Sequence, residues 1–218
     1  LSLHKMLGGY TDHFKAYGSI LDFNLDEDQA VELAQRFVQR GFKAIKVKVG
    51  SPEVARDIQR LLAVKKAVGG DIELTADANV AWDAPTTIQR MKAYKQAGIR
   101  LGYIEDPIPH DDIDAFAALA GHVDVEVIGH DYASTALEIA ALLQTGALQG
   151  VRCGCDIDTI LDVTALAQQF GVRMFFGNSL FEINVHAACA LSGVDRLEFS
   201  DLAWNKLVKD PVRFRSEE

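Results

Sequence analysis

The chain has 218 residues, of which 49% are hydrophobic, so it is long enough for one globular domain with a sizeable core. Its 31 acidic and 22 basic residues give a net charge of -9, which argues against nucleic acid or an anionic membrane as a partner. The odd number of cysteines, three, argues against a disulfide framework, and without a signal sequence or an apolar run of about 20 residues we expect a cytoplasmic protein.

Short β-rich runs alternate with longer amphipathic segments along the chain, a pattern typical of parallel strands joined by crossover helices. The predicted strands are Lys15–Ile20, Ala44–Val49, Ile72–Ala78, Leu101–Glu105, Val125–Gly129, Gly150–Cys153, Val172–Gly177 and Arg196–Ser200. The predicted helices are Asp26–Arg40, Ser51–Val68, Pro85–Ala97, Asp111–Leu119, Thr135–Thr145, Ile157–Phe170 and Phe181–Leu191. Left-handed helix caps are expected at Gly41, Gly98, Gly146 and Gly171.

Eight strands and seven helices predict an α/β fold, a TIM-like (β/α)7β barrel. An open doubly wound sheet is the alternative arrangement of the same elements. A dinucleotide-binding sheet of that kind is disfavoured, because no Gly-x-Gly-x-x-Gly follows the first strand.

Two lysines, Lys46 and Lys48, lie two residues apart on the second predicted strand. Alternation along a strand directs both amines to one face, while Ile45 and Val47 point to the other. In a barrel that face is the interior, where a lysine must pair with an acid or lose its charge. We therefore interpret the pair as a site for acid–base chemistry rather than as a solvated edge.

Acidic residues end the next two strands, at Asp77, which Asn79 follows, and at Glu105. Catalytic groups of such a barrel gather at the carboxyl ends of its strands. A single acid there is usually a helix cap, but two acids on neighbouring strands repel each other unless a cation lies between them. Oxygen ligands favour a hard ion, so the pair predicts a Mg²⁺ site.

Together these motifs resemble the enolase superfamily, specifically its mandelate racemase and muconate lactonizing enzyme group, over nearly the whole chain. The corresponding motifs end the second, third, fourth, fifth and eighth strands: Lys46/Lys48, Asp77/Asn79, Glu105-Asp106-Pro107, Gly129-His130-Asp131 and Glu198. The family normally carries an N-terminal α+β capping domain. We therefore expect residues 1–218 to be the barrel domain, with the capping domain not present in this chain.

The resemblance implies removal of the proton α to a carboxylate, giving an enediolate that Mg²⁺ stabilises. Lys48 would be the base, and Lys46 would favour its neutral form by charge repulsion and bind the substrate carboxylate. Asn79 would contact the substrate. Glu198, if protonated, would donate to the developing oxyanion, although a capping role or a surface ion pair is the alternative. The expected partner is a small carboxylate substrate, bound by a homo-oligomer.

The fifth strand departs from the family pattern, because His130 takes the place of the usual third carboxylate ligand and Asp131 follows it. Imidazole is a poor ligand for Mg²⁺. The alternatives are that Asp131 turns inward as the ligand, that the site binds more weakly, or that the ion is softer, such as Mn²⁺. For His130 we weigh a metal ligand, a general acid or base, and a core histidine.

A second departure concerns the acid or base on the opposite face of the substrate. The family's racemases and many of its acid-sugar dehydratases use a seventh-strand His held by a sixth-strand Asp, but these positions fall on Gly177 or Asn178 and on Gly150. The lactonizing branch has a sixth-strand lysine, near which this chain has Arg152. A reaction with a base on only one face of the substrate is therefore favoured. The main candidate is dehydration of a sugar acid by a metal-dependent hydro-lyase, and the alternative is racemisation or epimerisation of a hydroxy acid.

Two further functions compete with this interpretation. A Schiff-base aldolase would use Lys48 as a nucleophile, although the neighbouring acids count against it. A catalytically degenerate barrel, retained for binding or assembly, would explain the missing dyad. Retention of several charges that are costly to bury, among them Lys46 and Glu105, argues against degeneracy.

Overall fold

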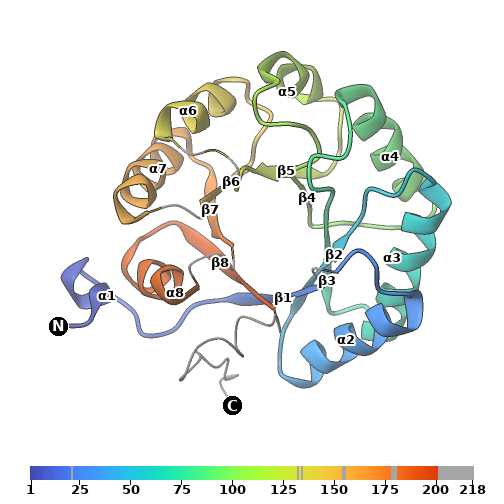
Figure 1. Cartoon of the computed structure of the whole chain (residues 1–218), viewed down its shortest axis with the longest axis horizontal. Coiled ribbons are helices and arrows are strands. Elements are labelled where there is room, and N and C mark those ends of the chain that lie inside the picture. Colours follow the sequence, from blue (N-terminus) through green and yellow to red (C-terminus); the bar gives the residue numbers. More distant parts are fainter. Residues whose placement is uncertain (21, 132, 134, 154–155, 178–180, 201–218) are drawn as a thin grey trace.

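The chain, described here by a computed structural model, forms a closed barrel of eight parallel strands in sequential order, ringed by helices (Figure 1). The structure describes residues 1–200 apart from positions 21, 132, 134, 154–155 and 178–180. The strands are β1 Ala16–Ile20, β2 Ala44–Lys48, β3 Glu73–Asp77, β4 Tyr103–Glu105, β5 Glu126–Gly129, β6 Gly150–Cys153, β7 Arg173–Phe176 and β8 Val194–Phe199. The predicted barrel and its eight strands are confirmed, with small differences at their ends.

Seven of the described helices alternate with the strands, and a further short helix precedes β1. Their bounds are α1 Leu3–Met6, α2 Glu27–Gln39, α3 Val54–Val68, α4 Ala84–Gln96, α5 Ile113–Leu119, α6 Ala136–Gln144, α7 Ile157–Phe170 and α8 Phe181–Ala190. The sequence did not predict α1, because one turn is too short to show helical periodicity. Among the described helices, none combines the length and the apolar character needed to cross a membrane.

Local signals set where the helices begin and end. Asp26 and Thr135 each form a capping box at the start of α2 and α6, and Asp156 accepts two backbone hydrogen bonds at the start of α7. The glycines predicted to end helices have positive φ angles between 68° and 93°, at Gly41, Gly98, Gly146 and Gly171. These caps return the chain to the barrel for the next strand.

Apolar side chains form two separate clusters, one on each side of the barrel wall. The larger cluster lies between strands and helices and includes the outward-facing Ile45 and Val47 of β2. The smaller cluster consists of Tyr103, Ile128 and Phe175, inside the barrel. The Tyr103 and Phe175 rings meet edge to face, with their centroids 5.4 Å apart.

Charged side chains occupy the interior next to this small cluster, at the carboxyl ends of the strands. Lys46, Asp77, Glu105, Arg152 and Glu198 are each no more than 2% exposed. The aromatic layer therefore separates a buried ionic layer from the amino-terminal end of the barrel.

Gly150, at the start of β6, leaves the space that the interior aromatic layer fills. A Cβ at this position would lie 2.6 Å from the Phe175 ring and 2.9 Å from Ile128. We expect Gly150→Ala to lower the free energy of unfolding by about 1–3 kcal/mol through overpacking, measured by urea denaturation. Gly70→Ala is the control, because a Cβ there meets no atom within 4 Å. Equal effects of the two substitutions would contradict this packing.

Candidate active site

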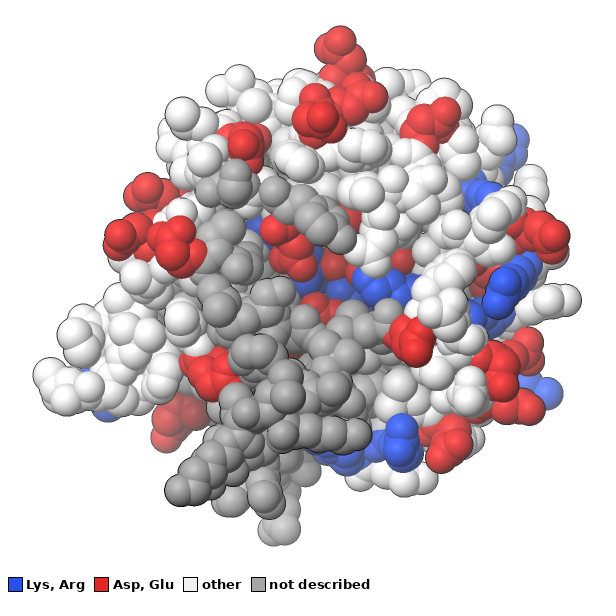
Figure 2. All heavy atoms as spheres, in the orientation of Figure 1, with Lys and Arg blue, Asp and Glu red and all other residues white. Residues whose placement is uncertain are grey.

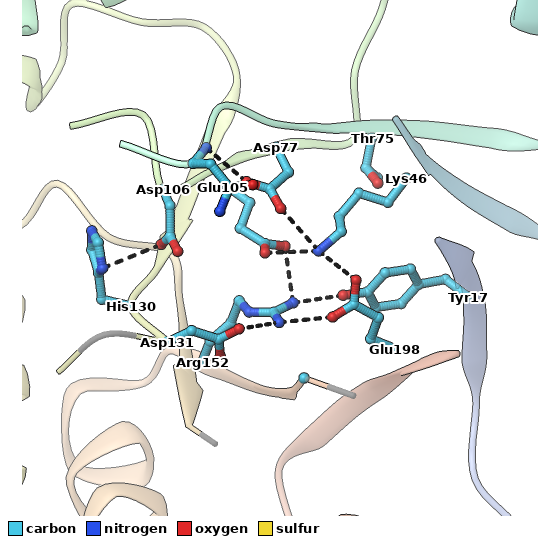
Figure 3. A network of polar contacts seen from close by, with 12 residues as sticks. Tyr17, Lys46, Thr75, Asp77, Glu105, Asp106, His130, Asp131, Arg152 and Glu198 are labelled. Carbon is cyan, nitrogen blue, oxygen red and sulfur yellow. Dashed lines mark hydrogen bonds and ion pairs between the residues drawn. The ribbon is translucent and has the colours of Figure 1, made fainter. Parts of the chain in front are cut away.

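Lys46 is the central amine of the ionic layer, and it is only 1% exposed (Figure 3). Its Nζ lies 2.7 Å from Glu105 Oε1, 2.8 Å from Glu198 Oε1 and 3.3 Å from Asp77 Oδ2. Burial and the charge of Arg152 lower the pKa of Lys46, but the surrounding carboxylates outweigh them and hold it well above its ordinary value. Lys46 is therefore a fixed cation.

Lys48 lies two residues further along β2 and nearer to solvent, with 9% of its surface exposed. Its Nζ is 2.5 Å from Asp77 Oδ2 and also donates to the carboxamide oxygen of Asn79. A cavity of about 230 Å³ opens here, lined by Phe23, Lys48, Val49, Gly50, Ala78, Asn79 and Ala81. Lys48 and Asn79 therefore line the same cavity.

The carboxylates that end β3 and β4 lie side by side, as the sequence predicted. Asp77 and Glu105 are direct register partners on the two strands. Asp106, next along the chain, is also buried, and its φ of 44° turns its side chain inward beside Glu105. Aspartate adopts this left-handed backbone more readily than most residues. Three carboxyl groups therefore gather at one side of the barrel mouth.

Arg152 of β6 fills the centre of the site, a place that sequence reasoning did not give it. Its Nη1 lies 3.0 Å from Glu105 Oε2, and its Nη2 lies 2.5 Å from Asp131 Oδ2 and 2.9 Å from Glu198 Oε2. Nη1 also donates to the Tyr17 hydroxyl at 2.6 Å. The available signal was an arginine at an inward-facing position of a short buried strand.

Glu198 of β8 is brought into the same cluster, between the two buried cations. Burial raises the pKa of Glu198, but Lys46 and Arg152 lower it more strongly, so the net pKa lies well below its usual range. The contacts of Glu198 with Lys46 and Arg152 therefore favour its ionised form, which accepts hydrogen bonds. The protonated donor that the resemblance implied stays a prediction, and the second cation beside it, Arg152, was not evident from the sequence.

The two candidate residues of the fifth strand differ in their surroundings. His130 is fully buried, with its ring packed near His110 and Phe116, its Nε2 3.1 Å from the Ile108 carbonyl oxygen, and its Nδ1 3.6 Å from Asp106 Oδ1. Burial lowers the pKa of His130 to about 4. Asp131, by contrast, faces the centre of the site through Arg152. The geometry favours a core histidine and an inward Asp131.

The cluster contains more acid than base. Its carboxyl groups are Asp77, Glu105, Asp106, Asp131 and Glu198, against the basic groups of Lys46, Lys48 and Arg152. Burial raises the pKa of Glu105 to about 8 against the opposing charges of Arg152 and Lys46, and it raises that of Asp106 well above its ordinary value. In the space-filling view, acidic and basic side chains lie together in the central hollow (Figure 2). Because these raised pKa values favour the protonated forms of Glu105 and Asp106, further positive charge at the cluster would displace protons from them.

Comparison with known proteins places this geometry in a family. The family model described as "Enolase C-terminal domain-like" matches residues 29–217. The chain belongs to the enolase superfamily. Its neighbours among solved structures include proteins described as mandelate racemase or muconate lactonizing enzyme, which agrees with the resemblance drawn from the motifs.

Three proteins illustrate the range of similarity to this enolase-superfamily barrel. A Mesorhizobium loti protein, solved as a proposed mandelate racemase, is 31% identical with a TM-score of 0.91 over 99% of this chain and 58% of its own. L-talarate dehydratase from Polaromonas sp. JS666, solved with Mg and L-glucarate, is 28% identical with a TM-score of 0.84 over 97% of this chain and 60% of its own. L-Ala-D/L-Glu epimerase from Bacillus subtilis is 26% identical over 91% of this chain and 56% of its own length.

These similarities define the function only coarsely. The relatives include both sugar-acid dehydratases and epimerases, and the chain spans a little over half the length of each protein compared. The superfamily assignment therefore supports chemistry of the enolase type, and the reaction itself needs evidence from the residues of this chain.

The positions expected for a His–Asp dyad carry no such pair in the described part of the chain. Gly150 lies in the aromatic layer, and Gly177, directly after β7, is so close to Arg152 that a Cβ would lie 2.7 Å from Nη2. The other expected position, Asn178, lies outside the described residues. The space beside β7 that a histidine would need is thus filled by the guanidinium.

The donor set suits the metal that the superfamily implies. Asp77, Glu105 and Asp131 follow or end three successive strands and supply the carboxylate oxygens that hard divalent cations prefer. Asp131 Oδ1 is buried with no hydrogen-bond partner among the described residues. Among the described residues, no group of three potential ligands lies close enough to hold one metal ion, because basic side chains lie between the carboxylates.

Replacing Lys46 tests the ionic layer. Lys46→Met would leave three buried carboxylates without their shared cation, and we expect it to lower the free energy of unfolding by about 3–5 kcal/mol in urea denaturation. Lys95→Met is the matched control, because Lys95 pairs with Asp124 in solvent and its loss should change stability little. A Lys46 variant as stable as the control would contradict the structural role of this cluster.

Proposed function

We propose that this barrel is the catalytic part of an enzyme that removes the proton α to the carboxylate of a small hydroxy acid, with Lys48 as the base. The observation that carries the proposal is the contrast between the two lysines of β2. Lys46 is sealed among carboxylates, whereas Lys48 and Asn79 line a cavity large enough for a small molecule. In its neutral form Lys48 accepts the proton, and the Asn79 amide orients the substrate.

We further propose Asp77, Glu105 and Asp131 as ligands of Mg²⁺, with Mn²⁺ as the alternative ion. When bound, the ion supplies positive charge that stabilises the negative charge developing on the substrate carboxylate. Within the chain itself, Lys46 contributes a second fixed positive charge next to Asp77 and Glu105. His130 has no part in this proposal, because it is buried on the far side of Asp106.

Dehydration is the reaction we favour. In an eight-stranded ring β6 lies across the barrel from β2, so Arg152 approaches the interior from the side opposite Lys48. Its neighbouring carboxylates hold the pKa of Arg152 well above its ordinary value despite burial, so it stays protonated and cannot serve as a second base. Lys48 alone then takes the α-proton and returns it to the departing β-hydroxyl, which leaves as water. The substrate class that fits is a sugar acid, bound by what we predict to be a cytoplasmic homo-oligomer.

Exchange of the α-proton with solvent tests the base. In D2O with Mg²⁺, we expect the chain to exchange the α-proton of a substrate chosen from a panel of sugar acids, followed by NMR. Lys48→Met should lower the exchange rate by about 10²–10⁴-fold, whereas Lys66→Met, on the exposed face of α3, should leave it unchanged. Exchange that survives the Lys48 substitution would refute the assignment, and absence of exchange across the panel would favour a degenerate barrel.

The products distinguish dehydration from epimerisation. With the same substrate, we expect a 2-keto-3-deoxy acid, detected as its semicarbazone, and no stereoisomer of the substrate. A divalent-metal chelator should abolish formation of the keto acid, and added Mg²⁺ should restore it. Formation of an epimer without any keto acid would mean that the reaction is epimerisation rather than dehydration. Activity that the chelator does not change would mean that the reaction needs no divalent metal.

A further inference from the structure

Arg152 is buried at the centre of the site, and both of its terminal nitrogens donate hydrogen bonds. Its side chain is 1% exposed, and both terminal nitrogens are engaged, Nη1 by Glu105 and Tyr17 and Nη2 by Asp131 and Glu198. A guanidinium with its donors in a rigid plane suits several carboxylates at once. It therefore neutralises acids that come from three other strands or their ends.

The surrounding backbone leaves room for this guanidinium. If Gly177 were replaced by a residue with a side chain, its Cβ would lie 2.7 Å from Arg152 Nη2 and 3.0 Å from Asp131 Oδ2. Its backbone φ is not left-handed, so the reason for glycine here is space rather than conformation. Any larger residue would push the guanidinium and Asp131 apart.

The guanidinium uses the same carboxylates that we propose as metal ligands. It contacts one oxygen of Glu105 and one of Asp131, whereas Asp77 instead contacts the two lysines. A divalent cation between Glu105 and Asp131 would lie beside a positive charge that cannot be lost by deprotonation. The two cations therefore compete for one set of ligands.

We propose that Arg152 is the resident cation of this cluster: in the metal-free protein it holds the carboxyl groups of Glu105, Asp131 and Glu198, and it releases Glu105 and Asp131 when a divalent metal binds. This inference rests on the metal site of the proposed function. Each metal-binding event then breaks a buried ion pair with Glu105 and a partly buried one with Asp131, so Arg152 stabilises the metal-free barrel and weakens its affinity for the metal. Glu198, outside the ligand set, retains Arg152 in the metal-bound form.

Calorimetric titration of the full chain with Mg²⁺ and with Mn²⁺ tests the competition. Arg152→Met should bind each metal about tenfold more tightly, or more, than the unmutated chain. Arg173→Met is the matched control, because Arg173 on the neighbouring strand β7 pairs with Glu126 and Asp195 away from the cluster. Its metal affinity should equal that of the unmutated chain.

Thermal unfolding gives the second readout. Without metal, Arg152→Met should melt about 10 °C lower than the unmutated chain, because buried carboxylates lose their partner. Saturating Mg²⁺ should raise its melting temperature more than that of the unmutated chain. If Arg152→Met does not fold, Arg152→Lys, which keeps the charge but loses the planar fork, should still bind metal more tightly than the unmutated chain.

The outcomes separate this inference from the proposed function. Equal metal affinity of the unmutated chain and the Arg152 variants would overturn the competition and leave the metal site standing. Failure of every folded variant to bind metal would overturn both. Tighter binding by the Arg152 variants alone supports the resident cation, whether or not a substrate has been found.

Discussion

Compensation of buried charge is the constraint on which this barrel depends. Ions removed from water are tolerated only where opposite charges and hydrogen bonds surround them. Here Lys46 and Arg152, from strands on opposite sides of the ring, each contact three carboxylates, and both share Glu105 and Glu198. The ion pairs thus tie together β2, β3, β4, β6 and β8 across the interior, in a space that the small aromatic cluster leaves unfilled.

The need to compensate buried charge also gives Lys46 and Lys48 different surroundings, although the two lysines are only two residues apart on β2. One step of two residues along a strand advances about 6.6 Å, enough to move an amine from the ionic layer to the edge of a cavity. Lys46 is held charged by its neighbours, and Lys48 is placed where a ligand can reach it. A single strand with the sequence Lys-x-Lys therefore supplies both a fixed positive charge and a candidate base.

The relatives show what this chain shares with a wider superfamily. The fold and superfamily are common to dehydratases and epimerases alike, so they restrict the chemistry without choosing a reaction. In this chain, the Arg152 side chain on β6 fills the space that Gly177 leaves directly after β7. In our proposal, Arg152 contributes only positive charge on its side of the site, and Lys48 on the opposite side transfers the proton.

Much of this protein followed from sequence alone, because periodicity, helix caps and strand-end motifs are local. They determined the eight strands, the barrel, and the convergence of Lys46 and Lys48 with Asp77 and Glu105, since parallel strands in a barrel place their carboxyl ends together. Only the tertiary structure decided which of His130 and Asp131 faces the centre, that Glu198 lies between two cations, and that Arg152 lies among the carboxylates. Those outcomes depend on which charges meet across the barrel, between residues as far apart in the sequence as Lys46 and Glu198, and the spacing of residues along the chain does not reveal such contacts.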